Sequence, residues 1–349
     1  WWKSDYLKYL RQSFLRNEKP KECSKCWGKE DTGLTSLRER SNIEHNAIFK
    51  NKYERNLKLI GKDNLAFPED VQMNITNLCN LKCQMCSGDN SSKLLIENNA
   101  LGYEELNQKD YDLKDIDYEK ILNLVKHDLK LLKILGGEPL FNPRVIKFLE
   151  LLVENGKAQD IKLHITTNGT ICNDKILSLL KKFKDLRIVF SVDGWGKCNE
   201  YMRFPSSWEV ISNNIKTFKN NLVNAYIMIN CVVQNLNVLY VDQLLKFANQ
   251  NEIFIKLDMV LEPDWLHLSI LPKNVLSMAH KKLSSIKDED LLHTDNVKEI
   301  INLLGQHINN YKLDEDKYKN FIDMINKRDN YRKVHIKDYM PELAEEILK

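Results

Sequence analysis

Three of the chain's eight cysteines, Cys79, Cys83 and Cys86, lie in one short segment with the spacing C-x-x-x-C-x-x-C. A cubane [4Fe–4S] cluster takes one thiolate per iron, so three cysteines in one loop would leave the fourth iron open to a substrate. The alternatives are a zinc site completed by another ligand, or buried free thiols. Because clustered cysteines in a large chain favour metal binding over a disulfide framework, we interpret the loop as an iron–sulfur site.

Glycine and polar residues follow three later β-rich segments of the chain. In chain order these are Gly136, Gly137 and Glu138, then Asn168, then Ser191 and Asp193. A glycine after a strand usually serves only to form a turn, so each group alone is weak evidence for a ligand site. In parallel α/β folds, however, ligands bind at the carboxyl ends of the strands. Together with the cysteine loop, these groups predict a ligand site at one edge of a sheet.

The middle of the chain alternates between strand and helix patterns. Short β-rich runs cover residues 71–76, 131–135, 161–166, 186–192, 225–233 and 253–259. Apolar residues with helical spacing lie between most of them, around residues 121–125, 176–183 and 241–248. A further helix is predicted to begin with Asn142 as N-cap and Pro143 in its first turn, and to end before Gly156. Strands joined by helical crossovers predict a parallel sheet.

The predicted strands are apolar on one face only. Residues 161–166, for example, alternate Ile, Leu and Ile with Lys, His and Thr. A doubly wound sheet or a filled barrel needs apolar residues on both faces. We therefore predict an α/β fold with a partial (βα)6 barrel, curved around a hydrated lumen. The residues with lumen-facing parity include Asn74, His164, Asn230, Lys256 and Asp258.

The barrel is predicted to occupy residues 68–272, between two appendages. Residues 1–67 are polar and contain Cys23 and Cys26, whereas residues 273–349 are mostly helical, charged and free of cysteine. The chain begins at Trp1, and its first residues already have the pattern of a folded segment. We therefore expect a fragment that lacks the true N-terminus of the protein.

Composition narrows the range of partners. Lys and Arg number 52 against 49 Asp and Glu, and no basic block indicates a nucleic-acid footprint. No apolar stretch approaches the roughly 20 residues of a membrane span, and the first residues lack the pattern of a signal peptide. We expect a cytoplasmic protein with neither a nucleic-acid nor a membrane partner.

The order of the motifs closely resembles the radical SAM superfamily, with the cysteine loop, Gly136-Gly-Glu138-Pro, Asn168-Gly and Ser191-x-Asp193 on successive βα units. The resemblance implies an enzyme in which the three cysteines of the loop hold a [4Fe–4S] cluster. That cluster would reductively cleave S-adenosylmethionine (SAM) to a 5′-deoxyadenosyl radical, which abstracts a substrate hydrogen. The protein would bind and orient these cofactors, which carry the difficult chemistry.

The resemblance also implies a role for each matching residue. The Gly136–Glu138 turn would meet the SAM amino group, since an ammonium suits backbone carbonyls and a carboxylate. The residues that would lie near the ribose are Asn168, Ser191 and Asp193. Arg203 matches a residue that reaches the SAM carboxylate, and Met85 one that packs near adenine. A surface arginine and an ordinary loop methionine are the alternatives.

A narrower resemblance is to twitch-domain radical SAM proteins. It rests on Trp2-Lys-Ser-Asp5, Leu10-Arg11, Pro20, Cys23-x-x-Cys26-Trp27, Glu30, Gly33, Ser36, Arg38, Asp329-x-x-Arg332 and Pro341-Glu-Leu. In that family an auxiliary iron–sulfur cluster uses the C-x-x-C pair together with upstream cysteines. Those upstream cysteines are absent here, so we expect a second cluster on Cys23 and Cys26 only in a longer form of the chain. The family also implies a peptide or protein substrate and an electron donor such as flavodoxin or ferredoxin.

The remaining cysteines give weaker signals. Cys172 and Cys231 have positions typical of small buried hydrophobes. Cys198 follows the fourth predicted strand near the expected SAM site, where a ligand or catalytic role is the alternative. Two other functions stay open, namely a non-catalytic zinc- or cluster-binding interaction protein and an activase that makes a glycyl radical on a partner. The sequence does not name the substrate.

Overall fold

The computed structural model describes residues 3–31, 35–49, 68–106, 129–291 and 293–349. The helix expected around residues 121–125 and the motif residues Trp2 and Gly33 lie outside this part of the chain. The chain divides into two compact units. The larger unit comprises Asp70–Asn123 and Lys130–Lys349, and the smaller one includes Trp1–Glu69.

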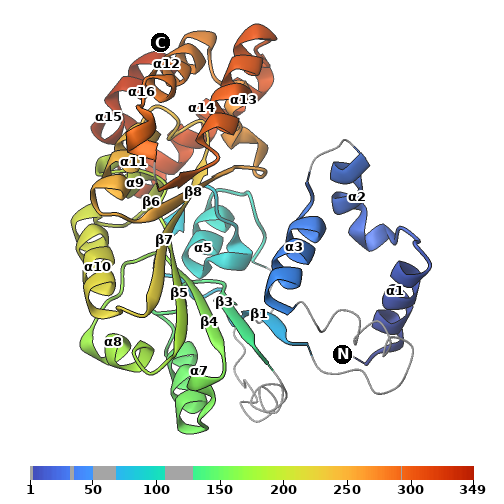
Figure 1. Ribbon diagram of the computed structural model, residues 1–349. Coiled ribbons are helices and arrows are strands. Elements are labelled where there is room, and N and C mark those ends of the chain that lie inside the picture. Colours follow the sequence, from blue (N-terminus) through green and yellow to red (C-terminus); the bar gives the residue numbers. More distant parts are fainter. Residues whose placement is uncertain (1–2, 32–34, 50–67, 107–128, 292) are drawn as a thin grey trace. The chain divides into compact units, whose positions relative to one another are not determined.

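The larger unit is built on a seven-stranded sheet in the order β1-β3-β4-β5-β7-β8-β9, with parallel pairing throughout (Figure 1). Its strands are β1 (Asp70–Asn74), β3 (Leu131–Leu135), β4 (Lys162–Thr167), β5 (Asp185–Ser191), β7 (Ala225–Val233), β8 (Phe254–Met259) and β9 (Thr294–Asp295). The six predicted strands are confirmed, with ends shifted by a residue or two. The strand β9 was not predicted, because two residues carry no periodic pattern.

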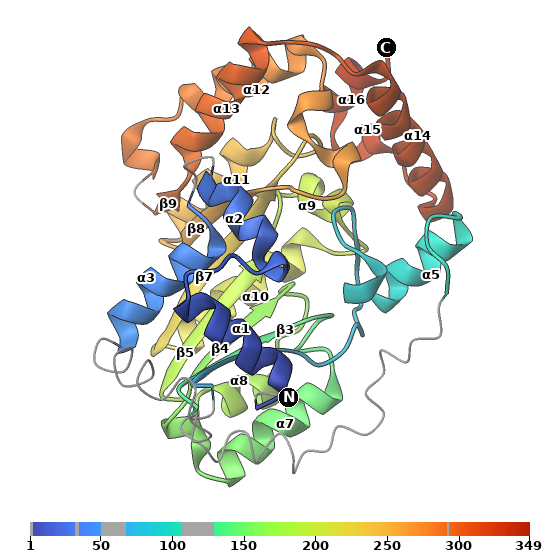
Figure 2. The same ribbon diagram turned by 90° about the vertical axis from the view of Figure 1, so that its right-hand side faces the viewer.

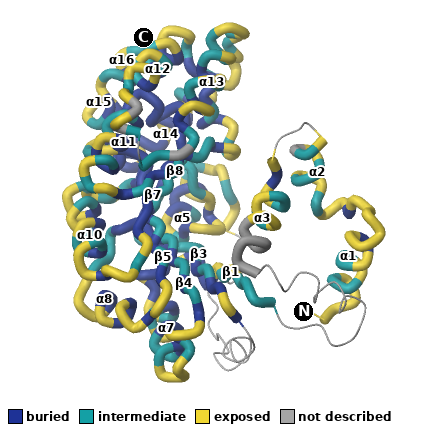
Figure 3. The backbone as a smooth tube through the Cα atoms, in the orientation of Figure 1, coloured by how far each residue is buried: buried dark blue, intermediate teal, exposed yellow. Residues whose placement is uncertain are grey.

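In the strands β4, β5 and β8, one face is buried and the other is mostly half-buried. Along β4 and β5, Leu163, Ile165, Ile188 and Phe190 are fully buried, whereas the residues between them keep part of their surface exposed (Figure 3). Each buried side chain of this kind contributes about 1.5–3 kcal/mol. The half-buried face carries the polar residues of lumen-facing parity. The prediction of a single apolar face is therefore confirmed for the three strands on which it rested.

Helices connect most of the strands. They are α5 (Ser92–Ala100), α7 (Pro143–Glu154), α8 (Asp174–Leu180), α9 (Lys197–Met202), α10 (Trp208–Asn221) and α11 (Val241–Gln250). The helix predicted from its capping residues is confirmed as α7. Asn142 Oδ1 accepts a hydrogen bond from the Arg144 amide at 2.8 Å, and Gly156, just past the end, has a left-handed φ of 69°. In Figure 1, α8 and α10 lie beside the strands β5 and β7.

Helices also make up most of residues 273–349, as predicted. They are α12 (Lys273–Ser284), α13 (Val297–Asn309), α14 (Glu315–Arg332), α15 (Ile336–Tyr339) and α16 (Pro341–Ile347). Asp314 is the N-cap of α14, and its carboxylate accepts a hydrogen bond from the Lys317 amide at 3.1 Å. Lys333, directly after the helix, caps its other end in a left-handed conformation. These helices belong to the same compact unit as the sheet.

The smaller unit contains the helices α1 (Asp5–Leu15), α2 (Ser24–Asp31) and α3 (Leu37–Phe49), with a short 3-10 helix, η1 (Lys21–Cys23), before α2. Glu30 and Arg38 join α2 to α3 by two parallel hydrogen bonds of 3.0 and 2.7 Å. The Arg38 guanidinium also lies 4.5 Å from the ring centre of Trp27. Ser36 donates a hydrogen bond to Glu30. These residues hold the helices α2 and α3 together.

Candidate active site

The cysteine loop leaves β1 at the carboxyl end of the sheet. Cys79 and Cys83 are each 7% exposed, and Cys86 is half-buried. Leu81 and Met85 pack with the three thiols in one cluster. Within the loop, β2 (Lys82–Cys83) pairs antiparallel with β6 (Arg203–Phe204), so that Cys83 stands opposite Arg203. Sequence patterns did not predict this pairing, because strands of two residues have no periodicity.

The Gly136–Glu138 turn packs directly on the cysteine loop. Both of its glycines have a left-handed φ, of 83° and 55°. A Cβ on Gly137 would collide with the carbonyl group of Leu78. The Glu138 amide donates a hydrogen bond to that same carbonyl at 2.9 Å. Glycine is therefore required here both by the backbone conformation and by the close approach of the two loops.

The Glu138 carboxylate joins the ends of two strands. It is 1% exposed. Its Oε1 accepts hydrogen bonds from Thr167 Oγ1 at 2.7 Å and from the Leu140 amide at 3.0 Å, and its Oε2 accepts one from the Asn168 amide at 2.6 Å. Burial raises the pKa of Glu138, and these hydrogen bonds oppose the rise. Glu138 thus holds the turn after β3 against the turn after β4.

Asn168 connects the end of β4 to the cysteine loop. Its Nδ2 lies 2.9 Å from Asn80 Oδ1 and 4.0 Å from Cys79 Sγ. Its Oδ1 accepts a hydrogen bond from the Thr170 hydroxyl at 2.6 Å. Sequence reasoning missed Asn80, because an asparagine between two cysteines is unremarkable by type. Only this contact shows that it belongs to the site.

Asp193 and Arg203 form a buried ion pair next to Cys83. Arg203 Nε lies 2.7 Å from Asp193 Oδ2, although the two atoms lack the angles of a hydrogen bond. Asp193 Oδ1 accepts a hydrogen bond from the Val232 amide at 2.8 Å, and Arg203 Nη1 donates one to Cys83 Sγ at 3.7 Å. Burial raises the pKa of Asp193, and Arg203 opposes the rise. Arg203 is therefore not a surface residue, and its charge lies at a cysteine of the loop.

The other predicted residues lie around these contacts. Ser191 is the last residue of β5 and stands opposite Asn230 of β7. Cys198 and Cys231 are buried, at 2% and 0% exposure. The expectation for Cys172 was wrong, because it precedes α8 and is half-buried, while the next residue, Asn173, caps that helix.

The protonation state of the loop thiols bears on what they can bind. Burial raises the pKa of Cys79 to about 11 and that of Cys86 to about 12. Both thiols are therefore protonated near neutral pH, and a bound metal would have to displace the protons.

The donor set fits an iron–sulfur cluster. Within the described ranges, no group of three or more His, Cys, Asp or Glu residues could hold a metal ion. A cubane cluster does not require several ligands around one metal ion, because each thiolate binds its own iron. Two buried thiols and one half-buried thiol on one loop, with the Arg203 guanidinium beside one sulfur, suit the negative charge of such a cluster.

The second cysteine pair lies in the smaller unit. Cys23 ends η1 and Cys26 lies in the first turn of α2, and both are half-buried. Burial raises the pKa of Cys23, with a smaller contribution from the neighbouring Cys26. Residues 1–69 contain no third cysteine in their sequence.

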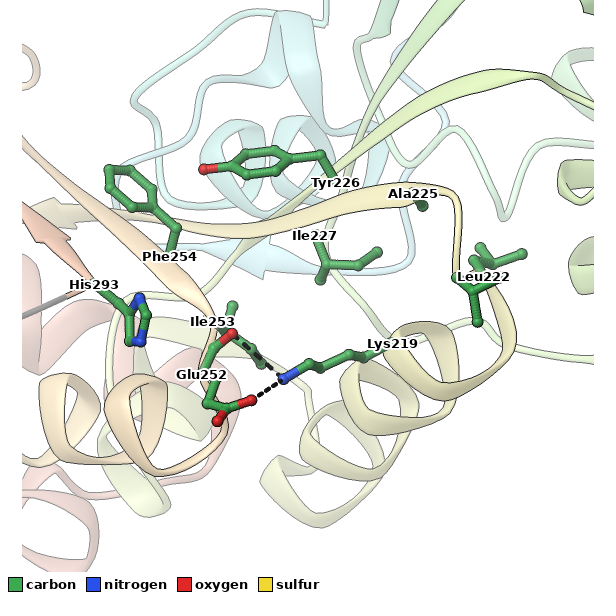
Figure 4. A pocket seen from close by; sticks show the side chains of 10 residues that line it. Lys219, Leu222, Ala225, Tyr226, Ile227, Glu252, Ile253, Phe254 and His293 are labelled. Carbon is green, nitrogen blue, oxygen red and sulfur yellow. Dashed lines mark hydrogen bonds and ion pairs between the residues drawn. The ribbon is translucent and has the colours of Figure 1, made fainter.

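A pocket of about 390 Å³ lies at the opposite end of the strands (Figure 4). Tyr226 and Phe254, at the starts of β7 and β8, form part of its lining. Lys219 and Glu252 meet across it in an ion pair of 3.5 Å. Because the cysteine loop lies at the carboxyl ends of the strands, this pocket is not part of the candidate site.

The fold and the site define an α/β protein with a three-cysteine loop at the carboxyl edge of a parallel sheet. The profile of the Radical SAM superfamily matches residues 73–248, which is about half of the chain. The chain therefore belongs to the radical SAM superfamily of enzymes. The narrower resemblance to twitch-domain proteins stays a prediction.

Similar curated proteins include the uncharacterized protein MJ0907 of Methanocaldococcus jannaschii, with 28% identity over 57% of this chain and 65% of that protein. A GTP 3′,8-cyclase of Campylobacter fetus is 26% identical over 55% of this chain and 52% of its own. The radical SAM cyclopropyl synthase TigE of Paramaledivibacter caminithermalis is 31% identical over 54% of this chain and 41% of its own. The matched segment spans less than two thirds of the length of each relative.

Solved structures with a similar arrangement include Streptococcus suis SuiB bound to S-adenosylmethionine. It shares 18% identity with this chain, over 70% of this chain and 51% of SuiB, with a TM-score of 0.45. The structure of native anSMEcpe with bound AdoMet shares 18% identity with this chain, over 63% of this chain and 60% of anSMEcpe, with a TM-score of 0.47. Among the described residues, no helix has the length and apolar character needed to span a bilayer.

Proposed function

We propose that the larger unit is the catalytic unit of a radical SAM enzyme, in which Cys79, Cys83 and Cys86 hold a [4Fe–4S] cluster. The observation that carries the proposal is the set of direct contacts between the cysteine loop and the neighbouring turns. Leu78 meets Glu138, Cys79 meets Asn168, and Cys83 meets Arg203. When bound, the cluster and SAM supply an organic radical that abstracts a substrate hydrogen.

The residues of the chain would bind and orient SAM. The Gly136–Glu138 turn is the proposed site of the SAM amino group, because Glu138 has about four lone-pair positions and three of them receive protein donors. Asn168, Ser191 and Asp193 are proposed to lie near the ribose, and Met85 near adenine. The Arg203 N–H groups not directed at Asp193 or Cys83 are available to the SAM carboxylate.

Anaerobic reconstitution tests this function. The loaded protein should be brown, contain about four irons and four sulfides at the loop, and form 5′-deoxyadenosine from SAM with dithionite. A colourless, zinc-loaded protein without SAM turnover would instead support the non-catalytic interaction protein. A glycyl radical formed on a partner protein would indicate an activase.

The proposed substrate is a peptide or protein segment. The half-buried polar face of the sheet supports this proposal, because its donors and acceptors suit backbone amides. Asn230 and Lys256 stand side by side in the register of β7 and β8. Lys256 also forms an ion pair of 2.7 Å with Asp258, and both side chains stay about one third exposed.

Substrate stimulation of SAM cleavage separates peptides from nucleotides. Candidate peptides should increase 5′-deoxyadenosine formation, and Asn230→Ala or Lys256→Met should reduce that increase while sparing the unstimulated rate. Lys216→Gln, at an exposed position of α10, is the matched control. Stimulation by GTP but by no peptide would contradict the proposal.

The proposal extends to the rest of the chain. Residues 1–67 are proposed as a twitch-like segment, residues 68–272 as the barrel and residues 273–349 as a helical extension. Cys23 and Cys26 would bind a second cluster only with cysteines from a longer form of the chain. The proposed electron donor is a flavodoxin or ferredoxin. The proposed compartment is the cytoplasm, where all eight thiols, free in this structure, would stay reduced.

A further inference from the structure

The helix α14 carries two buried arginines that meet the backbone on either side of Cys83. Arg328 Nη1 donates hydrogen bonds to the carbonyl oxygen of Gln84 at 3.1 Å and to its side-chain Oε1 at 3.0 Å. Arg332 Nη2 donates one to the carbonyl oxygen of Lys82 at 2.8 Å. The two arginines are 3% and 7% exposed. Both carbonyl groups that flank Cys83 in sequence are thus held from one helix.

Arg332 also pairs with a buried carboxylate, that of Glu97. Its Nε and Nη2 lie 2.9 and 2.7 Å from Glu97 Oε1, and Glu97 is fully buried in α5. Lys82 Nζ lies 2.8 Å from the other carboxylate oxygen. The three charges form one buried network, and Arg328 adds a contact of 3.4 Å to Asn98 of α5. Figure 1 and Figure 2 both show α14 beside α5.

The same helix holds the partner strand of β2. Asp329 Oδ1 accepts a hydrogen bond from the Tyr201 hydroxyl at 2.8 Å. Tyr201 lies in α9, directly before β6, and the carbonyl of the next residue, Met202, accepts a hydrogen bond from the Gln84 amide at 2.9 Å. Asp329 Oδ2 accepts one from the Ile336 amide at 2.8 Å. Both strands of the β2–β6 pair are therefore attached to one helix.

We infer that α14 is a positioning element for the cysteine loop, in which Arg328 and Arg332 fix the backbone of Lys82–Gln84 and thereby the direction of the Cys83 thiol. The consequence of this positioning is that the helix determines how firmly the cluster is retained. This consequence rests on the proposed function. A buried charge-assisted hydrogen bond to a carbonyl is directional, so its loss should loosen the loop segment that it holds. Neither arginine is a catalytic residue.

Two measurements on the full chain test the inference. In the metal-free protein, Arg328→Gln should raise hydrogen exchange at the amides of residues 82–84 by about tenfold, as expected for the loss of one hydrogen bond to a charged group. In the reconstituted protein, the same substitution should speed iron release to a chelator by a similar factor. Arg328→Lys, which keeps the charge but replaces the planar guanidinium with a compact ammonium, should show smaller changes in both measurements than Arg328→Gln.

A variant on another helix of the same unit separates positioning from general destabilisation. Leu304 is fully buried in α13, so Leu304→Ala should lower the melting temperature. At a matched loss of stability, it should leave both the exchange at residues 82–84 and the iron release near the parent values. Equal effects of Leu304→Ala and Arg328→Gln would overturn the inference, as would unchanged exchange in Arg328→Gln.

The exchange measurement does not depend on a cluster. If the chain bound no iron and Arg328→Gln still raised exchange at residues 82–84, the proposed function would fail while the positioning role held. If the cluster were bound normally and neither measurement changed in Arg328→Gln, the positioning role would fail while the proposed function held.

Discussion

The two cysteine groups of this chain differ in how many elements hold them. The loop with Cys83 contacts the turns after β3 and β4, pairs with β6 and is bound by α14. Cys23 and Cys26 lie on adjoining short helices of the smaller unit, where the Glu30–Arg38 pair holds α2 to α3. Short cysteine spacing is common to both groups. The first group is surrounded by independent elements that could fix several ligands.

The charge networks of the two regions differ in the same way. The Asp193–Arg203 pair has exposed side-chain fractions of 0% and 10%, whereas the Glu30–Arg38 pair has 14% and 34%. A buried charge that loses its partner is costly, because water cannot replace the lost interaction. The comparison therefore predicts unequal consequences for equivalent substitutions.

Asp193→Asn should have the largest effect on stability. It would leave the Arg203 guanidinium buried beside Cys83 without its anion, and the free energy of unfolding should fall by about 3–5 kcal/mol. Denaturant titration of the metal-free protein measures this loss. Glu30→Gln, the equivalent change in the smaller unit, should cause a clearly smaller loss. Equal losses would remove the contrast between the two networks.

Glu138→Ala should weaken SAM binding by about 1–3 kcal/mol, because it removes a charged partner and frees three buried donors of the turn region. Isothermal titration of the reconstituted protein with SAM measures the dissociation constant. Glu39→Ala, which removes an acceptor from the Ser36 amide in the smaller unit, is the control and should leave that constant unchanged. An unaltered constant in Glu138→Ala would exclude Glu138 from the SAM site.

His164→Gln should change how stability depends on pH. Burial, with Arg187 and Lys162 nearby, lowers the pKa of His164 to about 4 from an ordinary 6.5. The neutral form is favoured in the folded state, so this contribution is complete above about pH 6.5 and is lost as the pH falls toward 4. Unfolding titrations between pH 7 and pH 4 should therefore show a smaller loss in His164→Gln than in the parent. Parallel curves would contradict the assignment.

Cys23→Ala should have the smallest effect of the series. Two cysteines cannot complete a cubane, so iron content and 5′-deoxyadenosine formation in this chain should stay at the parent values. Iron above one cluster per chain that disappears in Cys23→Ala would show that other ligands within the chain complete a second site.

Sequence patterns predicted the parts of the site that depend on local chemistry. The alternation of apolar and polar residues predicted the strands. The sequence motif predicted the Gly136–Glu138 turn, and the backbone conformation in the structure explains why glycine is needed there. The contacts between distant segments could not be predicted in this way. Arg332 and Lys82 are 250 positions apart, and no periodic signal connects them. Arg203 was assigned to SAM alone, because its ion pair with Asp193 depends on how α9 and β6 pack.

The most direct test of the account is the iron and sulfide content of the reconstituted Cys83→Ala variant, measured beside Cys23→Ala and the parent chain. The parent and Cys23→Ala should each hold about four irons and four sulfides and should cleave SAM. Cys83→Ala should lose both the cluster and the cleavage while it keeps its fold by circular dichroism. Full iron content and SAM cleavage in Cys83→Ala would contradict the assignment of the cluster to this loop.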